Sequence, residues 1–378
     1  MPRVSSGRLV LAGSALVCVV LGSVHGFSVF LDPLETKLNL GRATVSLTYS
    51  FALVALTLTV LLGPKLYSAF QPAAIFGCVG VLGALGAMLA GVSQGIFGIW
   101  LGYSALFGVA NGLGYGFSLQ YAARANPNHS GVAMGIVTAA YALGAAVSPR
   151  AFVAMLEFGE FFGAMALLAT ATALACAVAA WFVWRAELPF EASSDAEAGA
   201  MPSVRTVVRT WLAYGLGVAA GLMAIGHAAG IASLAGITPW LAPAVLAVCN
   251  LVGSLIGGLL VDRFSPRRLL PLIPLISVLG LVMLAFSPAI TLFALGLVGL
   301  AYGCTISAYP AVIAKDYPGS SGPRVYGLVF TAWGAAGLAA PWLAGALFDQ
   351  TQSYSSALWI AAVLAATSSV LAIRLSRR

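Results

Sequence analysis

Long apolar runs alternate with short polar stretches along almost the whole chain. A hydrocarbon core about 30 Å thick is crossed by roughly 20 residues of helix, and the apolar runs reach that length. Strands of a membrane barrel would instead alternate apolar and polar positions over about 10 residues. The pattern therefore predicts an all-α membrane protein with twelve transmembrane helices, at residues 9–31, 43–63, 72–91, 96–121, 131–156, 160–184, 206–228, 240–261, 269–287, 289–313, 324–347 and 354–374.

The charged residues predict how these spans are oriented. They make up 8% of the chain, against about 25% in ordinary soluble domains. Most Lys and Arg residues fall in loops on the side of the N-terminus, whereas Lys37 and Arg42 fall on the opposite, external side. Since positive loops stay in the cytoplasm, both termini are predicted to be cytoplasmic, in a bacterial inner membrane. The net charge of +7 then faces anionic lipid, and no nucleic-acid partner is expected.

Residues 185–204 form the one polar stretch of low hydrophobicity, and they divide the spans into two sets of six. We therefore expect an N-terminal six-helix bundle at residues 1–184, a cytoplasmic linker at 185–204 and a C-terminal six-helix bundle at 205–378.

The two halves also resemble each other in sequence. Residues 135–149 of the fifth span match residues 327–341 of the eleventh, and the stretch around Asn111 in the fourth span matches that around Tyr302 in the tenth. Both matches have an offset of 191–192 residues. Two pseudo-symmetric bundles are typical of transporters whose substrate site lies between the halves near mid-membrane.

One cytoplasmic loop carries a recognisable motif. The sequence from Gly258 to Arg268 resembles the Gly-x-x-x-Asp-Arg-x-x-x-Arg-Arg loop of the major facilitator superfamily. The resemblance implies the major facilitator fold and a gating role for Asp262, Arg263 and Arg267. The equivalent first-half stretch, which begins at Gly63, lacks the Asp-Arg pair. We therefore expect a cytoplasmic latch that differs between the halves.

Four further stretches are similar to the oxalate/formate antiporter and monocarboxylate transporter group, at residues 26–35, 42–46, 226–231 and 326–334. Oxalate carriers of this group place an Arg after Asn-x-x-Gly in the eighth span and a Lys in the eleventh. Here Ser254 follows the stretch that begins at Asn250 and takes the place of the Arg. Trp333 takes the place of the Lys. Since neither cation is present, a dianionic substrate is not expected.

Three ionisable residues lie within spans, where charge is expensive and often functional. His25 and His227 occupy similar depths in the first and seventh spans. Each imidazole could donate to a carboxylate and titrate near neutral pH, or simply pack between helices. Arg150 lies near the external end of the fifth span, where it either attracts anions or extends toward water.

Amide, hydroxyl and aromatic side chains complete the predicted substrate site, because small ligands are held by apolar walls with a few polar groups. Packing between helices is the alternative for each of them. The set comprises Tyr49, Asn111, Tyr115, Tyr141, Asn250, Ser254, Tyr302 and Trp333.

The sequence favours a secondary active transporter that moves a small organic anion, a monocarboxylate above all, by alternating access. Protons or a counter-transported anion are the expected coupling partners. Transport or export of a neutral or weakly polar molecule is the alternative. A membrane receptor or enzyme would need a soluble domain or a catalytic constellation, and the sequence has neither. No cofactor and no metal site are expected.

Overall fold

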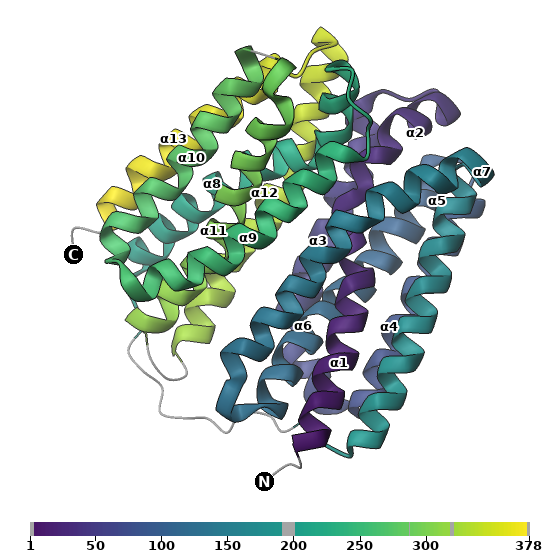
Figure 1. Ribbon diagram of the computed structural model, residues 1–378, viewed down its shortest axis with the longest axis vertical. Coiled ribbons are helices and arrows are strands. Elements are labelled where there is room, and N and C mark those ends of the chain that lie inside the picture. Colours follow the sequence, from purple (N-terminus) through teal and green to yellow (C-terminus); the bar gives the residue numbers. More distant parts are fainter. Residues whose placement is uncertain (1–3, 191–200, 287, 318–320, 376–378) are drawn as a thin grey trace. The chain divides into compact units, whose positions relative to one another are not determined.

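The computed structural model describes residues 4–190, 201–286, 288–317 and 321–375, and within them every regular element is a helix. The elements are α1 (Val4–Leu21), η1 (Gly22–Phe30), α2 (Leu31–Leu38), α3 (Arg42–Ala69), α4 (Pro72–Val92), α5 (Ile96–Ile99), η2 (Trp100–Phe107), α6 (Gly108–Ala125), η3 (Pro127–His129), α7 (Ser130–Ala186), α8 (Val204–Leu234), α9 (Leu241–Arg263), α10 (Pro266–Phe286), η4 (Pro288–Ile290), α11 (Thr291–Asp316), α12 (Ser321–Thr351) and α13 (Ser355–Leu375). Figure 1 shows their course.

The helices account for the predicted spans. In the described residues, 11 helical segments are long and apolar enough to cross a membrane. The longest runs through α7, where Gly159 and Glu160 leave the helical conformation and Glu160 adopts a φ of 51°. This break falls where the predicted span 131–156 has ended and the predicted span 160–184 begins. Dividing α7 at the break therefore gives the twelve predicted spans.

The chain packs as two compact units. The first comprises Met1–Leu40 and Phe51–Ala192, and the second comprises Gly41–Ser50 and Ser193–Arg378. The helix α3 is continuous from Arg42 to Ala69, so the two units share it. Its first residues, up to Ser50, belong to the second unit, and the rest belongs to the first.

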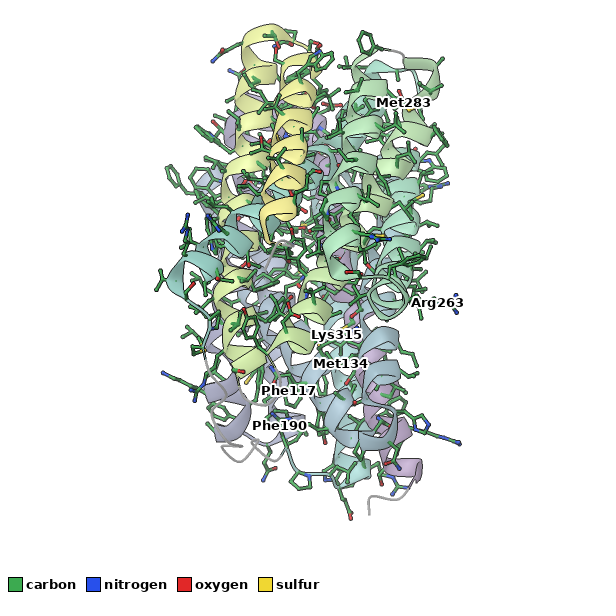
Figure 2. The ribbon with its side chains drawn as sticks, turned by 90° about the vertical axis from the view of Figure 1, so that its left-hand side faces the viewer. Phe117, Met134, Phe190, Arg263, Met283 and Lys315 are labelled. Atoms are coloured by element: carbon green, nitrogen blue, oxygen red, sulfur yellow. The ribbon has the colours of Figure 1, made fainter. Side chains whose placement is uncertain are left out.

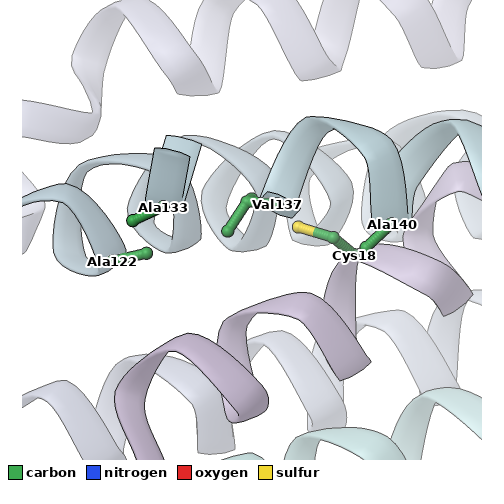
Figure 3. Packing of buried hydrophobic residues seen from close by; sticks show 5 residues of the cluster. All are labelled: Cys18, Ala122, Ala133, Val137 and Ala140. Atoms are coloured by element: carbon green, nitrogen blue, oxygen red, sulfur yellow. The ribbon is translucent and has the colours of Figure 1, made fainter. Parts of the chain in front are cut away.

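Small side chains hold the helices of the first unit together. Cys18 of α1 packs against Ala122 of α6 and against Ala133, Val137 and Ala140 of α7, as Figure 3 shows. In lipid, small residues of this kind let helix backbones approach closely and gain van der Waals contact. The α1 helix therefore lies along α7 (Figure 1).

Glycines mark the same helix crossing in both units, which gives the sequence repeat a structural counterpart. In the first unit, a Cβ on Gly108 or Gly112 would meet the α3 backbone at Ala52 or Leu56. In the second unit, Gly299 and Gly303 of α11 face the α9 backbone at Leu246 and Asn250 in the same way. The two pairs are 191 residues apart in the sequence. Each unit thus uses the same pair of glycines to bring two helices together.

The chain that follows α7 stays on the first unit. The Tyr121 hydroxyl donates to the carbonyl of Leu188, and the Phe190 ring lies 5.5 Å from that of Phe117 (Figure 2). The guanidinium of Arg124 lies 4.1 Å from the centre of the Phe190 ring. The first residues of the predicted linker are therefore fixed, and residues 191–200 lie outside those described.

Candidate functional site

Asn111 joins three elements of the first unit. At Leu21 the first span changes from α-helix to the 3-10 segment η1, and the Asn111 Nδ2 donates to the Leu21 carbonyl over 2.6 Å. The Asn111 Oδ1 accepts a hydrogen bond of 2.9 Å from the hydroxyl of Tyr141. Because Asn111 is fully buried, this amide fixes both the Leu21 junction and the Tyr141 ring.

Tyr141 also belongs to an aromatic group that Asn111 supports. The His25 ring lies 5.7 Å from the Tyr141 ring in an edge-to-face arrangement, and the Tyr115 ring lies 4.7 Å from it. Unlike Asn111, the residues His25, Tyr115 and Tyr141 are partly exposed. Four predicted site residues thus come together, and three of them are partly exposed.

The second unit repeats this arrangement with different chemistry. The Trp333 indole nitrogen donates to the Tyr302 hydroxyl over 2.8 Å, and the Phe330 ring stacks on Trp333 with 5.6 Å between ring centres. Trp333 and Tyr302 follow Tyr141 and Asn111 by 192 and 191 residues. The same two repeat positions therefore form a hydrogen-bonded pair in each unit, and both second-unit partners are buried.

Asn250 and Ser254 lie on α9 and bond to each other. The Ser254 hydroxyl donates to the Asn250 side-chain oxygen over 3.4 Å, and the Asn250 backbone lies against Gly303 of α11. Tyr49, on the part of α3 that belongs to the second unit, is buried and lies near Gly226. Asn250 and Ser254 thus lie against Gly303, the residue that follows Tyr302.

The sequence analysis placed Arg42 on the external side of the membrane, which stays a prediction, and the structure adds that this side chain is buried. Arg42 is only 5% exposed, and it is the charged residue that the described part of the chain buries. Its guanidinium lies 4.1 Å from the centre of the Phe348 ring, and its Nη1 donates to the Tyr354 hydroxyl over 2.6 Å. The cation is held by aromatic rings and a hydroxyl, a favourable setting for guanidinium away from water.

The fully buried His227 is linked to Arg42 through the Tyr354 hydroxyl, and we call Arg42, Tyr354 and His227 the polar chain. Its Nε2 lies 2.8 Å from the carbonyl of Pro341, and its Nδ1 lies 3.2 Å from the Tyr354 hydroxyl. Because a carbonyl only accepts, Nε2 carries the proton, and Nδ1 of a neutral ring accepts from Tyr354. The Tyr354 hydroxyl in turn accepts from Arg42. The geometry therefore fits a neutral imidazole tied to a buried cation.

Two glycines of α8 make room for this chain. A Cβ on Gly226 would meet the ring of Pro341, and a Cβ on Gly230 would meet the Tyr354 hydroxyl and the Arg42 Nη1. The sequence motif that surrounds His227 thus has a structural explanation. Each glycine lets a partner from α3, α12 or α13 reach the histidine.

The remaining predicted residues lie elsewhere. Arg150 is exposed on α7, and Arg263 is exposed at the end of α9, where it projects from the ribbon in Figure 2. The side chains of Asp262 and Arg267 are outside the described part of the chain. Among the described residues, no group of three or more His, Cys, Asp or Glu side chains could hold a metal ion.

Comparisons with known proteins agree with this architecture. The sequence pattern of the Major Facilitator Superfamily matches residues 12–290 and 229–378. A relative from Escherichia coli (strain K12), the uncharacterized MFS-type transporter YhjX, is 26% identical over 351 residues, which cover 86% of this chain and 84% of the relative. These matches confirm the superfamily resemblance, whereas the oxalate/formate and monocarboxylate branch stays a prediction.

Solved structures show the same fold. A bacterial homolog of the human lysosomal transporter Spinster matches with a TM-score of 0.78 at 12% identity, over 100% of this chain and 98% of that one. The xylose transporter XylE from E. coli matches with a TM-score of 0.76 at 13% identity, over 97% and 95%. The POT family transporter PepTSo matches with a TM-score of 0.76 at 11% identity, over 100% and 98%.

Proposed function

The chain belongs to the major facilitator superfamily, and we propose that it is a secondary transporter of a small organic monoanion, a short monocarboxylate above all. The observation that carries the proposal is the buried Arg42 in the second unit. Protons or a counter-transported anion are the coupling partners that we infer.

The chemistry of Arg42 supports an anionic ligand. A guanidinium presents N–H donors in a planar fork that matches a carboxylate. Taking such a cation out of water costs several kcal/mol unless other groups compensate for the lost hydration. Phe348 and Tyr354 supply part of that compensation. A substrate carboxylate that reaches Arg42 would accept hydrogen bonds from this fork.

The charge count favours a monoanion over a dianion. His227 is held as a neutral donor to Pro341, so it adds no second cation beside Arg42. At the two positions where oxalate carriers hold cations, Ser254 bonds to Asn250 and Trp333 bonds to Tyr302. A single buried guanidinium offers its fork to one carboxylate, whereas a second carboxylate would carry a desolvation cost with no further buried cation among the described residues beside it.

A neutral or weakly polar solute is the second candidate. The partly exposed rings of His25, Tyr115 and Tyr141 in the first unit favour it, because they offer stacking and hydrogen bonds without a formal charge. In that case Arg42 would serve packing alone, and its removal would change stability more than substrate choice.

Uptake by proteoliposomes that contain Arg42 variants distinguishes a monoanionic substrate from a neutral one. We expect Arg42→Gln to reduce monocarboxylate uptake by at least about tenfold, since removing one partner of a buried charge pair costs about 2–5 kcal/mol. Arg42→Lys should keep part of the uptake, because it retains the positive charge. It should not keep all of it, because lysine lacks the planar fork of N–H donors. Arg205→Gln, at an exposed position in α8, is the control for the loss of one positive charge. Unchanged anion uptake by a folded Arg42→Gln protein would exclude the proposal.

A further inference from the structure

The fourth span contains a segment whose winding the second unit does not repeat. Residues Trp100–Phe107 form the π-helical segment η2, whereas α11 (Thr291–Asp316) is α-helical over the matching residues. A π-helix is rare, and where one occurs within a longer helix it frequently marks a functional site. In the fourth span, η2 is therefore the place where the first unit departs from the repeat.

Gly86 of α4 lies against one wide turn of η2. A Cβ at Gly86 would stand 2.6 Å from the carbonyl oxygen of Gly102 and 2.6 Å from the backbone nitrogen of Phe107. These two residues are five positions apart, which is the spacing of a π-helical hydrogen bond. The same Cβ would stand 2.9 Å from the Cβ of Leu106. The crossing of α4 with η2 therefore spans the wide turn from end to end.

The second unit builds the same crossing with one residue fewer. A Cβ at Gly280 of α10 would stand 2.6 Å from the Ala294 carbonyl oxygen and 3.1 Å from the Leu297 Cβ. Ala294 follows Gly102 by 192 residues. Leu297 follows Leu106 by only 191. The first unit thus has one extra residue between the two contacts, and the wide turn of η2 accommodates it.

The segment η1 is a second departure from the repeat. A Cβ at Gly26 would stand 3.5 Å from Pro149, and a Cβ at Gly226 would stand 3.0 Å from Pro341, so positions 26 and 226 are equivalent. The first unit winds as a 3-10 helix over Gly22–Phe30, whereas α8 is α-helical at the equivalent positions. Each residue turns the chain by about 120° in a 3-10 helix and by about 100° in an α-helix. Side chains of η1 therefore point in other directions than their equivalents in α8.

This winding sets the direction of His25. Over the four residues from Leu21 to His25, the 3-10 form adds a rotation of about 80° relative to an α-helix. His25 is partly exposed, and its ring lies edge-on to Tyr141. Its equivalent in the α-helical α8 is Ile225, which is 4% exposed. The 3-10 form of η1 therefore turns position 25 out of the packed interior.

Tyr103 joins the two irregular segments. It lies in the wide turn of η2 and is fully buried, and its ring centre is 5.2 Å from that of Phe27 in η1. Phe27 is two residues beyond His25. The Tyr103 hydroxyl has no hydrogen-bond partner among the described residues, so the ring alone makes the contact. The extra residue of η2 and the winding of η1 thus meet in one aromatic pair.

We propose that Tyr103 is a positioning residue, which holds η1 in its 3-10 form through Phe27 and thereby keeps His25 beside Tyr141. The proposal rests on the proposed transport function, in which His25 belongs to the candidate substrate site. All of these contacts lie within the first unit.

Modification of His25 by diethyl pyrocarbonate, which reacts with accessible imidazole nitrogens, tests the proposal. The rate is followed by mass spectrometry on the purified protein in detergent, and the exposed His129 reports on the reagent in each sample. Tyr103→Ala should slow modification of His25 by about threefold or more, the change in population that loss of an aromatic pair causes. Phe27→Leu, which removes the other ring, should have the same effect. Tyr103→Phe keeps the ring and should match the wild type.

Deletion of Ala105 tests whether η2 holds an insertion. Ala105 is exposed and lies between the two contacts with Gly86, so its removal gives the spacing found in the second unit. The deletion variant should keep the Tm of the wild type. Deletion of Phe293, an exposed residue of α11, is the matched control and should lower the Tm by about 5 °C or more, because it shifts the register of a regular helix. An equal loss of Tm in both variants would overturn the assignment of an extra residue.

Uptake distinguishes a positioning residue from one that only packs. His25→Gln should lower monocarboxylate uptake in the wild type and should cause no further loss in Tyr103→Ala, because His25 has then already left its place. Losses that add would overturn the positioning role, and so would unchanged modification of His25 in folded Tyr103→Ala and Phe27→Leu proteins. Because modification requires no substrate, its result stands even if the monoanion assignment fails. Loss of anion uptake by Arg42→Gln would likewise stand if the positioning role fails.

Discussion

Arg42 and His227 hold the hydroxyl of Tyr354 between them. The Arg42 Nη1 donates to it over 2.6 Å, and the His227 Nδ1 lies 3.2 Å away on the imidazole side. These residues come from α3, α8 and α13, which are far apart in the sequence. The hydroxyl therefore links the buried cation of the proposed anion site to the histidine that the sequence singles out.

Tyr354→Phe tests this link. The change leaves the ring in place but removes the oxygen that accepts from Arg42, so a charged donor loses its partner. An unsatisfied buried polar group costs about 1–3 kcal/mol, and we expect the apparent affinity for a monocarboxylate to fall about tenfold. Tyr103→Phe is the control, because the buried Tyr103 hydroxyl has no hydrogen-bond partner among the described residues. Equal transport by both variants would show that the Tyr354 hydroxyl plays no part.

Proton coupling can be assigned to one histidine. His227 is buried and bonded as a neutral ring beside a cation, whereas His25 is partly exposed and packs edge-on against Tyr141. If an inward proton gradient stimulates uptake, His25→Gln should abolish the stimulation and His227→Gln should retain it. Uptake measured with and without the gradient in each variant decides the assignment. Loss of stimulation in His227→Gln alone would reverse it.

Asn111→Ala should destabilise the first unit. It leaves the buried Leu21 carbonyl and the Tyr141 hydroxyl without their amide partner, so the free energy of unfolding should fall by about 1–3 kcal/mol. Thermal unfolding in detergent measures the loss. Tyr141→Phe, which removes one of the two hydrogen bonds and keeps the ring, should cost less. A larger effect of Tyr141→Phe would contradict the central role given to Asn111.

Much of the fold could be predicted from the sequence, because hydropathy depends on local composition. The span limits, the break near residue 159 and the 191-residue repeat all follow from such patterns. The pairing of Tyr141 with Asn111 also lies within the predicted set, since the repeat singled out both helices.

The burial of Arg42 could not be predicted in the same way. An Arg that begins an apolar span is normally solvated, and only the contacts with Phe348 and Tyr354, some 300 residues later, remove it from water. The hydrogen bond from the Arg42 backbone N–H to the Asp349 carboxylate depends on the same long-range packing. The change of helix type at Gly22 was missed because the 3-10 segment η1 is as apolar as a regular helix. The available signal for Arg42 was its place in the stretch 42–46, which is similar to the transporter group.

Trp333→Ala should relax the selection for substrate size more than it lowers transport. The indole stacks on Phe330 and donates to Tyr302, so its loss removes a rigid wall and leaves the polar chain at Arg42 intact. Competition by monocarboxylates of increasing chain length measures the effect. A variant that loses transport of every substrate would indicate that Trp333 supports the fold rather than selects the ligand.

Competition between substrates of different charge tests the central claim most directly. Uptake of a labelled short monocarboxylate into proteoliposomes is challenged with unlabelled monocarboxylates, with oxalate and other small dicarboxylates, and with uncharged amide analogues. One buried cation predicts strong competition by monocarboxylates and weak competition by dicarboxylates, and Arg42→Gln should remove the preference for the charged form. Oxalate that competes as strongly as a matched monocarboxylate, or competition by the uncharged analogues alone, would contradict the account.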